Sequence, residues 1–262
     1  MDNRPIGMFD SGVGGMTVLK EVKKKLPNES FVYFGDNKRF PYGSKSKEAI
    51  IELTKNGIDF LIRQNVKLIV IACGTATSQA LEEVKRIYKI PIIGVIEPTV
   101  QYMEKQNYKK VGVIATAGTI RSKGWEEAIH KEIPNVEIQS KACPLLASMV
   151  EEGWTDNQIA KLVVNEYIKD LKNIDALVLG CTHYPLLENT IKEQLGKKTE
   201  TLNTGKFVAM KVEELLKESQ MQNEEKKEED KIFLTDMTTH FNEIASRLFG
   251  EEIKPLQAQE RE

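Results

Sequence analysis

Length and composition describe a globular chain with room for one large or two ordinary domains, since it has 262 residues of which 40% are hydrophobic, and we favour two. Its 37 basic and 39 acidic residues give a formal net charge of −2, so it lacks the positive field that a nucleic-acid partner requires. The amino terminus has no signal segment, and the longest apolar run, residues 68–73, is too short to span a membrane. We therefore expect a cytoplasmic protein with neither nucleic acid nor membrane as a partner.

Short runs rich in isoleucine and valine alternate with amphipathic stretches along the chain. Residues 47–63, for example, place Ile50, Ile58 and Leu61 on one face with lysine and glutamate opposite, which is typical of a helix that covers a sheet. Strands separated by helices predict parallel βαβ units. The predicted strands are residues 6–9, 31–34, 68–72, 92–95, 111–115, 136–139, 176–179 and 232–234.

Two breaks divide this pattern into two units. Glu97 follows a predicted strand and precedes Pro98, and a residue before proline is disfavoured in helical geometry. The second break falls at residues 202–207. We predict a first α/β domain of residues 1–97 plus 207–262 and a second domain of residues 98–206.

The carboxyl-terminal part of the chain is expected to return to one of these units. A helix is predicted at residues 206–218, and another at 239–250 follows a short strand. Between them lies the charged sequence "QNEEKKEEDK" at residues 222–231, which we interpret as a flexible, solvated loop or a frayed helix end.

The first predicted strand ends in "FDSGVGG", a turn that is suited to holding an anion such as a carboxylate. Its backbone amides and the start of the next helix are the donors. A nucleotide site is disfavoured, because Thr17 stands where a dinucleotide fingerprint needs glycine and no Gly-Lys-Ser/Thr ending is present. An ordinary tight turn also explains the glycines. The residues concerned are Asp10, Ser11, Gly12, Gly14 and Gly15.

The second predicted strand leads into the polar loop "GDNKRFPYGSKS". Amides around Pro41, Tyr42 and Gly43 would complete a carboxylate site. An ordinary surface loop is the simpler interpretation of the residues alone, because proline and glycine are common in turns.

Two of the three cysteines follow predicted strands at matching corners. Cys73 precedes Thr75 and Thr77, and Cys181 precedes Thr182 and His183. A helix amino terminus lowers the pKa of a thiol below its free value of about 8.5. A single cysteine at a strand end is usually a small buried hydrophobe, but two in the same setting indicate a shared role.

The repeated corner suggests a reaction. If the two units face one another, the two thiols would lie on opposite sides of a small molecule. One thiolate would then remove a proton from a carbon while the other thiol returns a proton to the opposite face, which is racemisation. Amides and threonine hydroxyls around the substrate carboxylate would stabilise the negative charge that develops.

Several motifs together resemble those of the glutamate racemases, in the cofactor-independent aspartate/glutamate racemase family. They are "DSGVGG", "YFGDNKRFPYGSKS", "IACGTATSQAL", "GVIEP", "CPLLASMVEEG", "LGCTHYPLLENTI" and "FLTDMTTHFNEIASRLFG". The resemblance covers nearly the whole chain. It implies two pseudosymmetric doubly wound α/β domains with mainly parallel sheets, an active site in the interdomain cleft, no cofactor, no metal and a homodimer. The implied activity is glutamate racemisation, which supplies D-glutamate for peptidoglycan.

The resemblance also implies residue roles. Cys73 and Cys181 would be the acid/base pair, helped by Asp10 and His183 respectively, with Glu151 as an auxiliary carboxylate and Glu152 as the competing choice. The implied substrate-binding residues are Asp10, Ser11, Pro41, Tyr42, Gly43, Gly74, Thr75, Thr182 and His183.

One position departs from the family pattern. The family usually has Cys-Asn-Thr where this chain has Cys73-Gly74-Thr75. A lost neutral hydrogen bond typically costs about 0.5–1.5 kcal/mol. We predict weaker substrate binding or altered activity, which Gly74→Asn would repair.

Other functions fit the residues less well. A racemase of another acidic amino acid such as aspartate would use the same two thiols. A Cys-His hydrolase needs only one of them. A zinc enzyme would need more closely spaced ligands than Cys73, Cys181 and His183. An amino-acid-binding protein would need no facing thiols.

Overall fold

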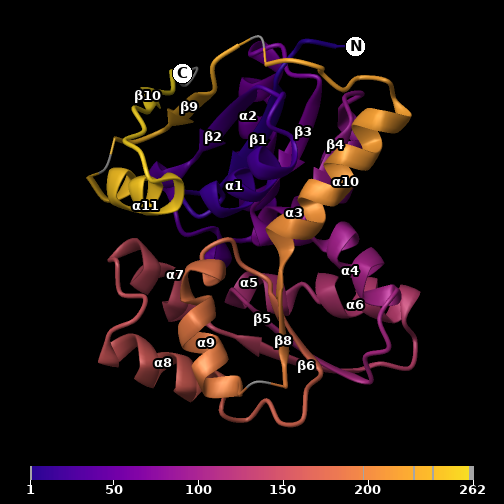
Figure 1. Cartoon of the computed structure of the whole chain (residues 1–262), viewed down its shortest axis with the longest axis vertical. Helices are drawn as coiled ribbons and strands as arrows, with labels where there is room; N and C mark the ends of the chain where they lie inside the picture. Colours follow the sequence, from indigo (N-terminus) through magenta and orange to yellow (C-terminus); the bar gives the residue numbers. More distant parts are fainter. Residues whose placement is uncertain (1, 197, 227, 238, 260–262) are drawn as a thin grey trace.

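The computed structural model describes residues 2–196, 198–226, 228–237 and 239–259, and it contains two parallel β-sheets with helices packed on both faces of each (Figure 1). The strand order is β10-β9-β2-β1-β3-β4 in the first sheet and β6-β5-β7-β8 in the second. All the strand pairs of the described residues are parallel. The predicted α/β class with mainly parallel sheets is confirmed.

The strands keep close to the predicted runs. Those of the first sheet are β1 (Ile6–Asp10), β2 (Phe31–Gly35), β3 (Leu68–Ile71), β4 (Ile92–Gly94), β9 (Lys231–Leu234) and β10 (Leu256–Gln257). Those of the second are β5 (Lys110–Ala115), β6 (Glu137–Ala142), β7 (Ala176–Leu179) and β8 (Glu200–Asn203). Two of them, β8 and β10, were not predicted, because β8 carries one buried leucine and β10 has two exposed residues at the sheet edge.

The two sheets repeat one topology. The order β2-β1-β3-β4 in the first sheet matches β6-β5-β7-β8 in the second, so β1 corresponds to β5 and β3 to β7. In both units the chain changes direction across the sheet between the first and third strands. Ligands bind at the carboxyl ends of parallel strands at such a switch point. The topology alone therefore predicts a ligand site at the carboxyl ends of β1 and β3 in the first unit and of β5 and β7 in the second.

Helices cover the strands as the amphipathic patterns predict. The helix expected at residues 47–63 is α2 (Lys47–Arg63), and the Ser46 side chain caps it by accepting a hydrogen bond from the Ala49 amide. The other α-helices are α1 (Met16–Lys25), α3 (Gly74–Ile87), α4 (Ile96–Glu104), α5 (Ala117–Arg121), α6 (Gly124–Glu132), α7 (Pro144–Glu151), α8 (Gln158–Ile168), α9 (Glu188–Leu195), α10 (Thr204–Glu218) and α11 (Thr239–Phe249).

The inner strands β1, β2 and β3 are buried on both faces, so their side chains alternate between two apolar layers. Met8 of β1 belongs to the cluster that contains Val22 of α1 and Val212 of α10, whereas the adjacent Phe9 belongs to the cluster that contains Leu61 of α2. A strand covered on both sides needs no polar face. This explains why β1 reads as a continuous buried run.

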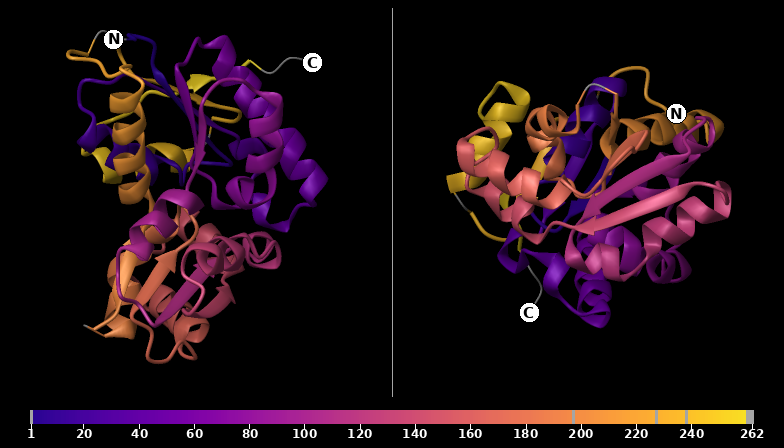
Figure 2. Two further views of the ribbon diagram at one scale, coloured as in Figure 1. Left: turned by 90° about the vertical axis from the view of Figure 1, so that its right-hand side faces the viewer. Right: turned by 90° about the horizontal axis from the view of Figure 1, so that it is seen from below.

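The chain passes between the two sheets near the predicted breaks. The first passage runs through α4 and the second runs from β8 into α10, which lies along the first unit (Figures 1 and 2). On this basis we propose residues 1–97 plus 207–262 and residues 98–206 as the two domains. The local expectation at Glu97 was wrong, since Glu97 and Pro98 lie in the first turn of α4, where proline is tolerated.

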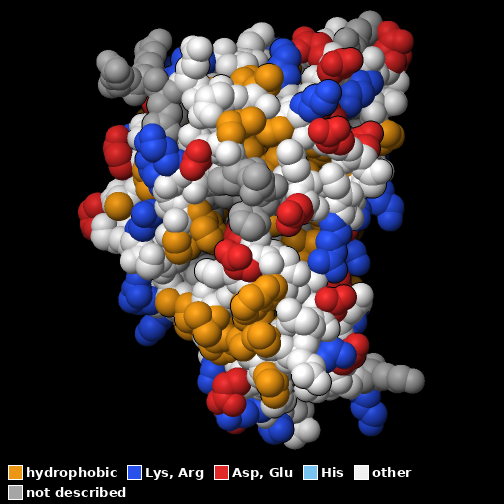
Figure 3. Space-filling model, turned by 90° about the vertical axis from the view of Figure 1, so that its left-hand side faces the viewer, with side chains coloured by type: hydrophobic (Ala, Val, Ile, Leu, Met, Phe, Trp, Pro, Cys, Tyr) orange, Lys and Arg blue, Asp and Glu red, His pale blue; other side chains and the backbone are white. Residues whose placement is uncertain are grey.

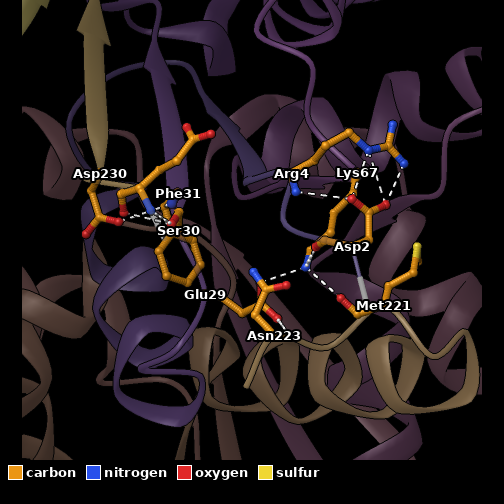
Figure 4. A network of polar contacts seen from close by, with 10 residues as sticks. Asp2, Arg4, Glu29, Ser30, Phe31, Lys67, Met221, Asn223 and Asp230 are labelled. Atoms are coloured by element: carbon orange, nitrogen blue, oxygen red, sulfur yellow. Dashed lines mark hydrogen bonds and ion pairs between the residues drawn. The ribbon is translucent and has the colours of Figure 1, made fainter. Parts of the chain in front are cut away.

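A buried ion pair lies at the amino-terminal ends of the strands of the first sheet, opposite to the switch point between β1 and β3 (Figure 4). Lys67 Nζ lies 2.7 Å from Glu29 Oε2 and also donates hydrogen bonds to the carbonyl oxygens of Asp2 and Met221. Glu29 in turn accepts hydrogen bonds from the backbone and side-chain nitrogens of Asn223. Both charges are thus compensated, as burial requires.

The charged segment at residues 222–231 is therefore more than a solvated loop. Its residues other than 227 form no regular element before β9, as expected. Asn223 is nevertheless buried against Glu29, and Asp230 accepts a hydrogen bond from the Phe31 amide and pairs with Lys23. The segment is anchored to the sheet at both of its ends.

Candidate active site

The carboxyl ends of β1, β3, β5 and β7 face a common cavity of about 110 Å³ between the two units. Cys73, after β3, and Cys181, after β7, both line it. The complete lining is Ser11, Phe40, Pro41, Tyr42, Gly43, Ser44, Cys73, Gly74, Thr75, Thr116, Ala117, Pro144, Ala147, Gly180, Cys181, Thr182 and His183. The structure thus brings together all the residues expected to hold substrate except Asp10, which lies buried just behind the lining.

Cys73 occupies the start of α3. Its sulfur accepts a hydrogen bond from the Ala76 amide at 3.4 Å and donates one to the Ser11 hydroxyl at 3.4 Å. Burial first, and the nearby Asp10 carboxylate second, raise the pKa of Cys73 to about 12. The expectation that the helix amino terminus would lower this pKa was wrong, because one long N–H···S contact does not offset desolvation.

Asp10 ends β1 and is fully buried. Burial raises its pKa to about 6, although His183 and the amides of Gly12 and Gly15 favour the charged form. The carboxylate accepts a hydrogen bond from the Gly12 amide at 3.0 Å and another from the Thr182 hydroxyl at 3.4 Å. Asp10 therefore connects the turn of one unit to the Cys181 corner of the other.

Cys181 lies in a different setting. Its sulfur is 3.7 Å from His183 Nδ1, and His183 Nε2 is 2.6 Å from Glu151 Oε1. Burial opposes protonation of His183, but the contacts with Cys181 and Glu151 outweigh it and raise the pKa well above its ordinary value. Glu151 is the carboxylate that reaches the imidazole, whereas Glu152 is exposed at the end of α7.

The buried carboxylate of Asp36 anchors the loop that follows β2. Asp36 accepts hydrogen bonds from the Tyr42 hydroxyl at 2.7 Å, from Arg39 at 2.8 Å and from Thr235 at 3.0 Å. Thr235 follows β9, so the returning carboxyl-terminal segment supports the loop. Tyr42 is only 1% exposed, and the loop lines the cavity instead of forming an ordinary surface turn.

Two threonines at the site were not predicted, Thr116 in the cavity lining and Thr119 beside it. Thr116, after β5, lies 2.9 Å from Thr75 and 2.9 Å from Thr119, hydroxyl to hydroxyl. Thr119 also contacts the Thr75 hydroxyl, at 3.2 Å. The structural repeat could have identified Thr116 as a site residue. It follows β5, the strand equivalent to β1, and so takes the place in the second unit that Asp10 has in the first.

Ligand anions in this cavity would be held mainly by amides and hydroxyls. None of the described lining residues is lysine or arginine, so backbone amides, the hydroxyls of serine and threonine residues and the His183 imidazole are the available groups. Across the described ranges, no cluster of three or more histidine, cysteine, aspartate or glutamate side chains has a geometry that could hold a metal ion. The described helices also include none with the length and apolar character needed to cross a membrane.

Comparisons with known proteins place this geometry in context. A family profile described as Asp/Glu/Hydantoin racemase matches residues 16–209. The glutamate racemase of Geobacter metallireducens is 41% identical over 251 residues, covering 94% of this chain and 93% of the relative. The glutamate racemase of Lactococcus lactis subsp. cremoris is 44% identical over 250 residues, covering 94% and 92%. The crystal structure of the Francisella tularensis glutamate racemase in complex with D-glutamate superposes with a TM-score of 0.91 at 39% identity, covering 98% of this chain and 97% of the other.

Proposed function

The chain belongs to the Asp/Glu/hydantoin racemase family and is an amino-acid racemase, an isomerase, and from this premise we propose that it interconverts L- and D-glutamate by a two-base transfer between Cys73 and Cys181. The observation that carries the proposal is that these two thiols, from equivalent corners of the two units, line one cavity. The curated relatives named above are glutamate racemases, and the glutamate racemase of Francisella tularensis was crystallised in complex with D-glutamate.

The reaction begins with one cysteine as thiolate and the other as thiol. The thiolate takes the α-proton of glutamate, which leaves an electron pair on the α-carbon and its carboxylate. The opposite thiol then gives its proton to the other face of the carbon. One S–H bond forms as the other breaks, so the products are the enantiomer and an enzyme with the two protonation states exchanged.

The two thiols have unlike surroundings. Burial and the nearby Asp10 carboxylate raise the pKa of Cys73 to about 12, which favours its protonated form at neutral pH. His183 lies beside Cys181, and its contacts with Cys181 and Glu151 raise the pKa of the imidazole against the effect of burial. On these grounds we propose Cys73 as the acid and Cys181 as the base of the first turnover.

The substrate carboxylates are held by amides and hydroxyls. We assign substrate binding to the lining residues Ser11, Pro41, Tyr42, Gly43, Gly74, Thr75, Thr182 and His183, and to Asp10, which contacts Thr182. Donors aimed at the α-carboxylate stabilise the charge that develops there as the proton leaves. The hydroxyl pair of Thr75 and Thr116 provides further donors between the two units.

We also propose a cytoplasmic homodimer that supplies D-glutamate for peptidoglycan. A surface suited to a second copy lies on α7, α8 and their connection, where apolar side chains are exposed together (Figure 3). They are Leu145, Trp154, Ile159 and Leu162, the last of which is 70% exposed. Sedimentation of the native chain and of Leu162→Glu tests this, and a native monomer would refute it.

One experiment tests the reaction. Metal-stripped protein is incubated with L-glutamate in deuterated water without pyridoxal phosphate, and optical rotation and deuterium at the α-carbon are followed. We expect rotation to decay while deuterium enters. A binding protein would show neither change, a hydrolase would need another substrate, and faster exchange of L-aspartate in a parallel assay would reassign the substrate.

A further inference from the structure

Gly74 and the carbonyl of Gly180 touch across the cleft. Gly74 is the first residue of α3 and follows Cys73, while Gly180 directly precedes Cys181. A Cβ atom at position 74 would overlap the Gly180 carbonyl oxygen, well inside van der Waals contact. The two cysteine corners therefore meet backbone to backbone.

The Gly180 carbonyl has little freedom to move away. The residue that carries it is tied to the second sheet, because the Gly180 amide, in the preceding peptide unit, donates a hydrogen bond of 2.8 Å to the Ile114 carbonyl. The space on its other side is also filled, since a Cβ at Gly180 would lie 2.9 Å from the Ile114 oxygen and 3.0 Å from Trp125 Nε1. A side chain at position 74 must therefore be accommodated by moving one unit relative to the other.

Nearby contacts show that the two units are closed around this point. The Thr17 hydroxyl of the first unit donates to the Thr182 carbonyl of the second at 2.8 Å. On the other flank, a Cβ at Gly43 would lie 2.6 Å from Thr116 Cβ. Movement at position 74 would disturb these contacts as well as the distance between the thiols.

We propose that Gly74 is a positioning residue that sets how closely the Cys73 and Cys181 corners approach, an inference that rests on the proposed two-thiol reaction. Without a side chain at this position the closed cleft brings both thiols onto one small substrate. Any Cβ at position 74 holds the corners apart. Gly74→Asn is consequently expected to lower activity instead of repairing a missing hydrogen bond, contrary to what the sequence suggested.

The first test needs no turnover. Native protein and Gly74→Ala are treated with iodoacetamide, and the alkylation rate of each cysteine is followed by peptide mass spectrometry. We expect Cys73 and Cys181, which are 5% and 7% exposed, to react faster in the variant. Cys143 is fully buried inside the second unit and is not part of the cavity lining, so it serves as the internal reference. Equal rates at Cys73 and Cys181 in the two proteins would overturn the proposal.

A matched variant tests whether the effect requires a new Cβ between the two units or arises from any tight contact elsewhere. Gly7→Ala, near the start of β1, adds a Cβ 3.1 Å from Val66 Cγ2, a tight contact inside the first unit and away from the cleft. We expect it to leave the relative alkylation rates of the three cysteines and kcat unchanged. Selective exposure of Cys73 and Cys181 in this control as well would refute a specific role for Gly74.

Kinetics supply the second test. Because small displacements of reacting groups are costly, we expect kcat of Gly74→Ala to fall by up to about 10²-fold in both directions. The primary isotope effect with α-deuterated glutamate should rise, as proton transfer becomes slower than the other steps. An unchanged kcat and isotope effect would contradict the proposal. If the native chain does not racemise glutamate, the proposed function fails while the alkylation test still decides the role of Gly74.

Discussion

The two halves of the cleft have the same backbone plan but different chemistry. Cys73 and Cys181 both follow the third strand of their unit, yet Cys73 lies beside Ser11 and Asp10, whereas Cys181 lies beside His183 and Glu151. Burial and Asp10 raise the pKa of Cys73, and the contacts of His183 with Cys181 and Glu151 raise the pKa of the imidazole. The repeated fold thus places the two cysteines at equivalent corners, and their unlike neighbours give the two corners different electrostatics.

The largest effect on activity is expected from replacing either cysteine. We expect Cys73→Ala and Cys181→Ala each to lower racemisation by about 10²- to 10⁴-fold, because each thiol is needed for one of the two proton transfers. Circular dichroism should show an intact fold. Deuterium exchange distinguishes the roles of the two thiols. In deuterated water each variant should introduce deuterium only into the enantiomer whose α-proton faces the remaining thiol. Retained racemisation in either variant would rule out the two-base reaction.

Glu151→Gln should affect only the Cys181 half. The carboxylate 2.6 Å from His183 supports the protonated imidazole, so its loss lowers the pKa of His183 and moves the alkaline decline of kcat to lower pH. We expect kcat to fall by about 10- to 100-fold, in line with a charge-assisted hydrogen bond of about 1.5–3 kcal/mol. Glu152→Gln, at the exposed neighbour, is the matched control. Equal losses in the two variants would remove the assignment of Glu151.

Asp36→Asn should weaken the hydrogen bonds that anchor the cavity loop containing Tyr42, while both cysteine corners stay in place. The carboxylate accepts hydrogen bonds from Tyr42, Arg39 and Thr235, and the amide can replace only some of them. We expect KM to rise about tenfold, the equivalent of about 1.4 kcal/mol, with a smaller change in kcat. A fall in kcat alone would show that the loop acts on chemistry instead of binding.

Asp10→Asn should have opposite effects on stability and activity. The pKa of Asp10 rises from its ordinary 3.8 to about 6, so the folded state binds more protons and native stability declines as pH rises between these values. That difference corresponds to about 3 kcal/mol at neutral pH. Denaturant unfolding at pH 4 and pH 7 should show the decline in the native chain and not in the variant, while racemisation falls. The same pH dependence in both proteins would contradict the assignment.

The ion pair far from the cleft should matter for stability alone. Lys67→Met leaves Glu29 buried without its cation and should lower the free energy of unfolding by about 3–5 kcal/mol. Activity per folded molecule should stay unchanged, which distinguishes this end of the sheet from the cleft. The double variant Lys67→Met with Glu29→Leu should recover part of the loss. A changed KM in folded Lys67→Met would indicate coupling to the cleft.

The sequence was informative where a residue type and its local position decide the outcome. Eight strands, the helix α2 and the pair Cys73 and Cys181 followed from apolar periodicity and repeated corners. It failed where packing decides. β8 has too few apolar residues to be recognised, Thr116 depends on the alignment of two units, and the pKa of Cys73 depends on burial that no local pattern reports. The contact of Gly74 with Gly180 joins positions more than a hundred residues apart.

The two passages of the chain between the units have a mechanical consequence. They follow β4 and β8, the fourth strand of each repeat, so both covalent connections lie along the same border of the molecule. Helices α4 and α10, which follow these passages, pack against each other. We expect any opening of the cleft to pivot at these two helices, so that the gap widens on the side of the molecule opposite to them.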